Sequence, residues 1–131
     1  MFDTSAIATQ KQPIELVGEF LDAWAMGDSE KVIGLFSEDA LFNASVGPEP
    51  GRTFRGRSEI APAVMQMLAA GKGSQFVINE TIPFEDGAVV TWMQTGTTHD
   101  GHSLNIKGID IFKVSDGLIV LKNAYRKVAQ S

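Results

Sequence analysis

The chain contains no cysteine and only two histidines, and this removes several kinds of chemistry. Without cysteine the protein has no disulfide, no thiolate nucleophile and no cysteine metal site. The histidines, His99 and His102, flank the turn residues Asp100 and Gly101, which favours solvent-exposed turn residues over a weak surface metal site. We therefore expect no resident metal and no cofactor.

The chain also lacks a basic stripe and a long hydrophobic run. Its formal charge is −5, and phosphate binding needs clustered Lys and Arg, so we expect no nucleic-acid partner and no membrane attachment. Arg52, Arg55 and Arg57 do cluster in a Gly/Pro-rich segment, where they form either a solvated rim or a small anion-binding patch. No apolar run reaches the length of a membrane span, and the first 12 residues, with Asp3 among them, do not resemble a secretory signal. These absences predict a cytoplasmic protein.

What the chain does contain is a helical first half. Residues 1–12 are polar and without period, so we expect a flexible N-terminal segment ahead of a single domain over residues 13–131. Apolar residues at helical spacing predict a helix over residues 13–26. Asp28 can cap a second helix, which is expected to end before Ser37. These two helices should form a hairpin.

A short strand, a loop and a third helix follow. Residues 40–46 have alternating character and predict the strand. Two prolines and two glycines exclude regular structure from residues 47–51, which could form part of a pocket lid. The third helix is expected to begin near Ser58 and to end at Gly71.

From Ser74 onward the apolar period changes from helical to two. Three Asp-Gly pairs separate the runs, which is typical of an antiparallel meander. The predicted strands cover residues 75–84, 88–98, 103–114 and 118–127. We expect an α+β fold in which three helices pack on one concave face of the sheet and leave a pocket.

Asp110 is the carboxylate that this pattern places in the middle of an apolar strand. It lies between Ile109 and Ile111 and precedes Phe112. Burying an ionised carboxylate without a partner costs several kcal/mol. Asp110 is therefore expected to be tightly paired, kept protonated, or turned toward a cavity.

Five separated runs of the chain together carry a family pattern: FLDAWAMGD (20–28), LFSEDA (35–40), FRGRSEI (54–60), GIDIF (108–112) and DGLI (116–119). In this order they resemble the nuclear transport factor 2-like superfamily, and within it the ketosteroid isomerase and SnoaL-like polyketide cyclase groups. The resemblance extends over about residues 14–127. It implies a cone-shaped, curved, mixed or antiparallel sheet wrapped around three helices, as in cystatin-like proteins. It also implies an open mouth that admits a small hydrophobic molecule, and assembly as a homodimer.

The resemblance carries over only part of a known catalytic set. Ketosteroid isomerases use a tyrosine in the first helix, an aspartate base in the first strand and a protonated aspartic acid in a late strand. The late acid corresponds to Asp110, but the tyrosine corresponds to Phe20 and the base to about Ala44. Isomerisation by that mechanism is therefore not expected. The Asp-Arg-Asp set of limonene epoxide hydrolases is also absent, since its approximate positions hold Gln94, Gly96 and Ala124.

Two cations are expected near Asp110. If Ala124 lines the cavity, as the resemblance implies, strand alternation places Lys122 and Arg126 on the same inner face. A cation beside Asp110 would keep it ionised, either as a general base or as half of a structural ion pair. Arg126 could alternatively recognise an acidic substrate.

Asp110 is accordingly the predicted catalytic residue. The predicted ligand-binding residues are Phe20, Trp24, Phe54, Met65, Met93, Thr95, Gly108, Lys122 and Arg126. One hypothesis is an isomerase, cyclase or hydratase that acts on a small hydrophobic carbonyl compound, with Asp110 as acid or base. The alternatives are a non-catalytic binding module with the same pocket and a purely structural dimer. Asn123 and Tyr125 are expected on the opposite, dimer-forming face of the sheet.

Overall fold

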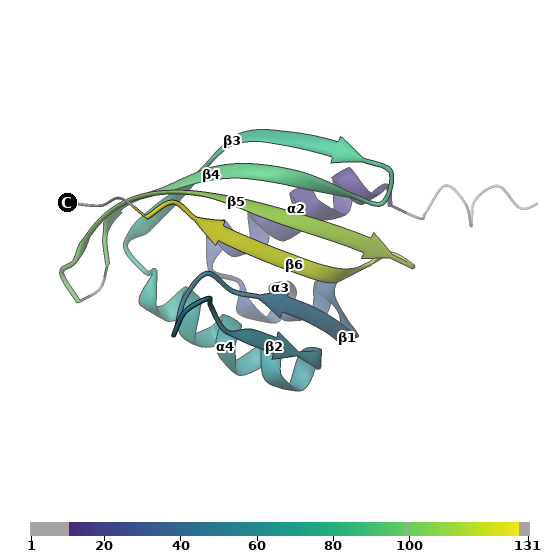
Figure 1. Cartoon of the computed structure of the whole chain (residues 1–131), viewed down its shortest axis with the longest axis horizontal. Coiled ribbons are helices and arrows are strands. Elements are labelled where there is room, and N and C mark those ends of the chain that lie inside the picture. The colour runs from purple at the N-terminus through teal and green to yellow at the C-terminus, as the bar shows by residue number, and fades with distance from the viewer. Residues whose placement is uncertain (1–10, 99, 129–131) are drawn as a thin grey trace, which may run out of the picture.

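The computed structural model of the chain describes residues 11–98 and 100–128, which form three helices and one six-stranded sheet (Figure 1). Residues 1–10, most of the segment expected to be flexible, lie outside the described residues, as do His99 and residues 129–131. Within the described part, the elements follow the predicted order, with one additional short strand before the third helix. The α+β class predicted from the sequence is confirmed.

The helix α2 (Pro13–Met26) begins and ends where the sequence predicts. Pro13 occupies the first turn, where a backbone N–H has no helical partner in any case. Gly27 ends the helix in the left-handed conformation, at φ 73°, and its N–H donates to the carbonyl of Trp24 at 3.1 Å. The buried face consists of Leu16, Val17, Phe20 and Ala23. This face directs α2 onto the sheet.

The other two helices are capped by acidic side chains. In α3 (Ser29–Leu35), the Asp28 carboxylate accepts a hydrogen bond from the N–H of Lys31 at 3.2 Å. The helix α4 (Gly56–Ala70) starts two residues before the predicted Ser58. Glu59 explains this earlier start, because its carboxylate reaches back to accept from the N–H of Arg55 at 2.8 Å.

The first strand, β1 (Phe36–Asn43), corrects the predicted strand over residues 40–46. Phe36 is already extended, at φ −78° and ψ 144°, and its ring is fully buried. The register of β1 shifts after Phe36, and such a bulge lets Glu38 and Asp39 both face solvent. The polar run that was expected to end the second helix therefore lies inside a strand.

The last four strands form the predicted antiparallel meander. They are β3 (Ser74–Phe84), β4 (Gly87–Thr97), β5 (Ser103–Ser115) and β6 (Leu118–Arg126). β1 pairs with β6 in the parallel direction, and the short β2 (Thr53–Arg55) pairs with β1 in the antiparallel direction. The order across the sheet is β2-β1-β6-β5-β4-β3, so the sheet is mixed and open.

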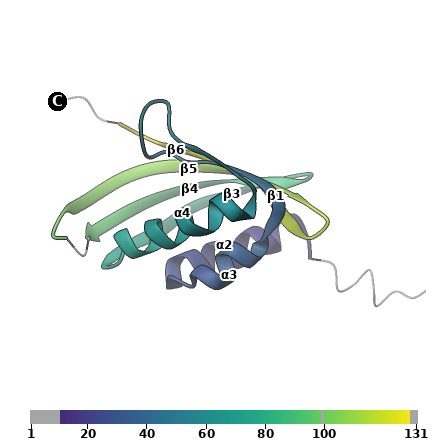
Figure 2. The same ribbon diagram turned by 90° about the horizontal axis from the view of Figure 1, so that it is seen from below.

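All three helices lie on one face of this curved sheet (Figure 2). Beneath them, the Phe20 ring contacts the rings of Phe36 and Phe112 edge to face, each at 5.3 Å between centroids. All three rings are fully buried. The packed core occupies the end of the inner sheet face that holds Ala88 on β4 and Phe112 on β5. Beyond Val90 and Phe112 the same face borders open space.

Candidate functional site

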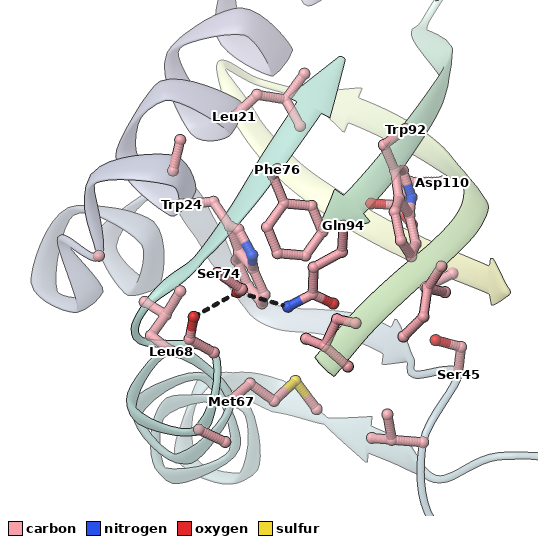
Figure 3. Close-up of a pocket in the computed structure, with 18 of the residues that line it drawn as sticks. Leu21, Trp24, Ser45, Met67, Leu68, Ser74, Phe76, Trp92, Gln94 and Asp110 are labelled. Atoms are coloured by element: carbon pink, nitrogen blue, oxygen red, sulfur yellow. Dashed lines mark hydrogen bonds between the residues drawn. The ribbon is translucent and has the colours of Figure 1, made fainter. Parts of the chain in front are cut away.

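A cavity of about 590 Å³ lies between α2, the C-terminal end of α4 and the inner sheet face (Figure 3). Its position follows from strand alternation, which turns every second residue of β4 and β5 toward the helices. Most of its wall is apolar or aromatic, including Trp24, Met67, Leu68, Phe76, Trp92 and Leu104. The volume falls in the range of small-molecule sites, about 300–1,000 Å³.

The floor of the cavity carries a buried ion pair between Asp110 and Lys122. Asp110 Oδ2 lies 3.2 Å from Lys122 Nζ, and the two residues are 6% and 5% exposed. Asp110 pairs with Ala124 across the β5-β6 ladder, whereas Lys122 pairs with Phe112. The two charged side chains are therefore diagonal neighbours on the inner face, as the alternation of the sequence predicts.

Three aromatic rings surround the Lys122 ammonium. Its Nζ lies 4.5 Å from the ring centroid of Phe42, 5.0 Å from that of Trp24 and 5.8 Å from that of Phe112. These distances are within the range of cation–π attraction. The rings and the carboxylate thus stabilise the cation where water does not reach it. Trp24 comes from α2 and lines the cavity beside Lys122.

Two buried polar atoms in the cavity wall lack hydrogen-bond partners among the described residues. Asp110 Oδ1 is an acceptor and Trp92 Nε1 is a donor. Leaving such a group unpaired costs about 1–3 kcal/mol, because its interaction with water is lost on burial. A ligand hydroxyl that donates to Asp110 or accepts from Trp92 would recover part of that free energy.

A short hydrogen-bonded chain continues along the wall at Gln94. The side-chain nitrogen of Gln94 donates to Ser74 Oγ at 2.9 Å, and Ser74 Oγ donates to the carbonyl of Gly71. Both side chains line the cavity, and Figure 3 shows the chain running from β4 to the segment after α4. Gln94 and Ser74 are not among the predicted site residues, although Val90 pairs with Asp110 and strand alternation from Val90 places Gln94 on the inner face.

Five of the predicted site residues line the cavity. They are Phe20, Trp24, Asp110, Lys122 and Arg126. Arg126 is exposed, and neither it nor the cavity-lining Lys72 forms an ion pair with any described residue. The cavity wall thus holds a buried ion pair with no net charge, Asp110 with Lys122, and two exposed cations, Arg126 and Lys72.

The remaining predicted ligand-binding residues do not line the cavity, which corrects that expectation. Met93 and Thr95 alternate with the cavity-lining Trp92 and Gln94, so they lie on the outer sheet face. Met65 is 56% exposed on α4. The methionine of α4 that does line the cavity is Met67, and its spacing from Ile60 and Val64 on one helical stripe could have indicated it.

Phe54 and Gly108 are also outside the cavity wall. The Phe54 ring packs on Phe42 at 5.9 Å between centroids, so it supports a residue near the site from behind. Gly108 lies beneath the ring of Trp92: a Cβ at this position would be 2.1 Å from Trp92 Cζ2. Gly108 therefore shapes the cavity indirectly, by giving the indole room to lie flat on β5.

Thr98, Asp100 and His102 lie together before β5, and Thr98 also lines the cavity. Thr98 Oγ1 donates to Asp100 Oδ1, and His102 Nδ1 lies 3.1 Å from the same oxygen. The hydrogen bond from Thr98, followed by that from His102, lowers the pKa of Asp100 to about 2. His99 lies outside the described residues, and those described hold no group of three His, Asp or Glu placed to bind a metal. None of the described helices is long and apolar enough to cross a membrane.

Comparison with known families gives one match over most of the chain. A model of the SnoaL-like domain matches residues 17–122. None of the curated proteins compared with the chain matches it.

Solved structures similar to this one share its fold. A nuclear transport factor 2-like protein of unknown function from Mesorhizobium loti is 23% identical, with 98% of this chain and 97% of that chain covered and a TM-score of 0.76. A candidate ketosteroid isomerase from Kribbella flavida is 18% identical, with 89% and 78% covered and a TM-score of 0.70. A Mycobacterium tuberculosis protein in complex with estradiol-17β-hemisuccinate is 17% identical, with 90% and 96% covered and a TM-score of 0.76. The predicted nuclear transport factor 2-like fold is confirmed.

Proposed function

This chain belongs to the SnoaL-like domain family, and on that premise we propose that it binds a small, mainly apolar molecule in the cavity beneath α2 and α4. The single observation that carries the proposal is the cavity itself. A space of about 590 Å³ is left open next to a well-packed aromatic core. A domain with a purely structural role would gain stability by filling that space with side chains.

The charges around the cavity support a ligand with an apolar body and an anionic or polar end. The Asp110 and Lys122 pair has no net charge, and the rings over Lys122 leave its surroundings apolar. Arg126 and Lys72 contribute positive charge to the cavity wall, against Asp22 alone. The Mycobacterium tuberculosis neighbour was solved with estradiol-17β-hemisuccinate, a ligand with an apolar body and a carboxylate end. That compound is a suitable first probe here.

The test is equilibrium binding of three probes: estradiol, estradiol-17β-hemisuccinate and 2-naphthol. We expect saturable binding at one site, seen as a change in tryptophan fluorescence, because Trp24 and Trp92 line the cavity. Arg126→Gln should weaken binding of the hemisuccinate more than binding of estradiol. Arg55→Gln is the matched control, since Arg55 is exposed and does not line the cavity.

A second variant tests whether the probes occupy this cavity. Ala124 lines it and faces Asp110 across the ladder, so Ala124→Phe should fill the space and abolish binding. Unchanged binding in this variant, or no saturable binding of any probe to the wild type, would rule out the proposal.

The second candidate function is catalysis, with Asp110 as acid or base toward a carbonyl-containing substrate. The observation in its favour is that Asp110 Oδ1 is left without a partner in the cavity wall. Against it, the wall offers only Phe20 and Ala44 where ketosteroid isomerases carry a tyrosine and a base. In a screen of β,γ-unsaturated ketones, Asp110→Asn should abolish turnover while probe binding persists. Equal turnover in both proteins would exclude Asp110 from the chemistry.

We further propose that a second copy of the chain covers the outer face of the sheet and that the protein is a cytoplasmic homodimer. Val77, Ile109 and Tyr125 are 47%, 42% and 56% exposed on this face, and Asn123 donates to the Tyr125 hydroxyl at 3.2 Å. Burial of such a face is the ordinary reason for a symmetric dimer. Sedimentation equilibrium should give twice the chain mass, and Tyr125→Arg should give the monomer mass. A monomeric wild type would disprove this assembly.

A further inference from the structure

We propose that Gln94 is a specificity-determining residue that selects ligands carrying a hydroxyl group, by accepting a hydrogen bond from that hydroxyl through Oε1. The inference rests on the proposed function, because it assigns a ligand class to the same cavity. It is carried by the direction of the hydrogen-bonded chain that holds the Gln94 amide.

The direction of the chain is fixed by the single hydrogen of the Ser74 hydroxyl. Ser74 Oγ donates that hydrogen to the carbonyl of Gly71, which also accepts from the backbone N–H of Ser74 at 2.9 Å. The hydroxyl therefore has only lone pairs to offer Gln94, and its partner at 2.9 Å must be the amide nitrogen. The Gln94 side chain is thus held with its nitrogen toward Ser74.

The end of α4 favours the same orientation. A Cβ built on Gly71 would lie 3.4 Å from the carbonyl oxygen of Met67, 3.5 Å from Gln94 Nε2 and 3.5 Å from Ser74 Oγ. The amide nitrogen therefore lies close to the carbonyl-bearing C-terminal turn of the helix, where the partial charge is negative. An amide oxygen in that place would face other oxygens, so a flip of Gln94 is opposed on two sides.

The opposite end of the amide is turned into the cavity. Figure 3 shows the Gln94 oxygen directed away from Ser74, toward the space between Trp24 and Trp92. Among the described residues, no side chain or backbone group donates a hydrogen bond to this oxygen. Nearby wall residues include Trp24, Phe76, Trp92 and Ile106, and the only polar atoms on these side chains are the two indole nitrogens. Gln94 Oε1 is consequently a fixed acceptor set in an apolar surface.

A fixed acceptor in an apolar surface favours ligands that can donate a hydrogen bond to it, because any other ligand leaves the acceptor buried and unpaired. A ligand hydroxyl can donate to Oε1, whereas an ether oxygen at the same place would displace water and offer no hydrogen. The Ser74 contact also prevents the amide from turning its nitrogen toward the ether. Selectivity for the hydroxyl therefore depends on both residues, although Ser74 acts only by positioning Gln94.

The test compares 2-naphthol with 2-methoxynaphthalene, in which a methyl group replaces the hydroxyl hydrogen. In the wild type we expect the naphthol to bind about tenfold more tightly than its methyl ether. Gln94→Leu should bring the two dissociation constants to within about twofold of each other, chiefly by weakening naphthol. Ser74→Ala should reduce the ratio by strengthening the ether, because the released amide can then rotate and donate to it. A merely structural role for Ser74 would weaken both probes alike.

Gln75→Leu is the matched control. Gln75 neighbours Ser74 on β3, is exposed, and does not line the cavity, so the same substitution there should leave the wild-type ratio unchanged. Equal binding of the two probes to the wild type, or a tenfold ratio that persists in Gln94→Leu, would overturn the inference while leaving the proposed ligand-binding function intact. Failure of both naphthalene probes to bind would overturn this inference, and it would overturn the proposed function as well only if estradiol and its hemisuccinate also failed to bind.

Discussion

The indole of Trp92 lies across Gly108, in the space that any larger residue at position 108 would need. The two residues are direct partners in the β4-β5 ladder, and a Cβ at Gly108 would lie within 2.1–2.5 Å of three indole carbons. The conformation of Gly108 is not what requires glycine, since its φ is not positive. The requirement comes from the neighbouring strand.

Gly108→Ala should therefore destabilise the fold. Overpacking of a buried position costs about 1–3 kcal/mol, because the displaced indole must leave its rotamer. The measurement is the urea midpoint at constant m value. Gly18→Ala is the control: nothing lies within 4 Å of a Cβ at that position in α2, and alanine favours a helix by up to about 1 kcal/mol. Equal effects of the two substitutions would contradict the packing explanation.

Removing one partner of the buried ion pair between Asp110 and Lys122 should lower the stability more than removing both partners. Lys122→Met leaves Asp110 buried without its cation and should reduce the free energy of unfolding by about 3–5 kcal/mol. Replacing Asp110 by Leu in the same chain should recover part of that loss, because no charge is then left buried. Lys31→Met removes an exposed cation 3.5 Å from Glu19 and should cost less than about 1 kcal/mol. Chemical denaturation of the four proteins would test this, and a double variant no more stable than Lys122→Met alone would count against it.

The two methionines of α4 should differ in their effect on ligand binding. Met67 is partly buried and lines the cavity, whereas Met65 is exposed on another side of the helix. Met67→Ala should enlarge the cavity, weaken probe binding several-fold and cost about 1–2 kcal/mol of stability. Met65→Ala should change stability by no more than about 0.5 kcal/mol and leave the affinity for 2-naphthol unaltered. Titration of both variants with 2-naphthol tests this prediction. A larger loss of affinity in Met65→Ala than in Met67→Ala would mean that α4 is rotated about its axis relative to this structure.

The turn before β5 predicts a measurable titration. The pKa of Asp100 is lowered from 3.8 to about 2, first by the hydrogen bond from Thr98 and then by that from His102. A lowered pKa in the folded state adds stability above pH 3.8, and that contribution is lost as the pH falls toward 2. Carbon-13 NMR of the carboxyl should give a midpoint of about 2, which Thr98→Val should move upward toward 3.8. A midpoint already near 3.8 in the wild type would show that the Thr98 hydrogen bond does not form in solution.

Much of the fold could be predicted because the residues that begin and end its helices and turns act locally, and the tertiary packing does not override them. The Pro13 start and Gly27 stop of α2, and the Asp-Gly turns of the meander, each have a backbone cause that acts within a few residues. The start of β1 could not be predicted in the same way. Whether Ser37 and its polar neighbours end a helix or form a bulge depends on the register with β6, which lies more than 80 positions further along the chain.

Strand alternation predicted cavity-lining residues correctly, whereas the family resemblance taken alone did so only in part. Because every second residue of a strand lies on the same face, Lys122 and Arg126 were expected beside Ala124, and both line the cavity. Met65 and Met93 were expected in the cavity from the family resemblance, and both lie elsewhere. The role of Gly108 depends on a cross-strand neighbour that sequence spacing alone does not identify.

The inner face of β4 changes character within two residues, from the packed Val90 to the cavity-lining Trp92. On β4 the core-packing and the cavity-lining positions are therefore separate, although Phe42 on β1 and Phe20 on α2 belong to both groups. Substitutions at Gln94 or Ile106 should change which molecule is accepted at less cost to the packed core than substitutions at Val90, whereas Asp110 and Lys122 are both buried and part of the cavity wall. The same backbone could therefore accept different ligands through substitutions in the cavity wall, while the packed end of the sheet at Ala88 and Phe112 keeps the fold.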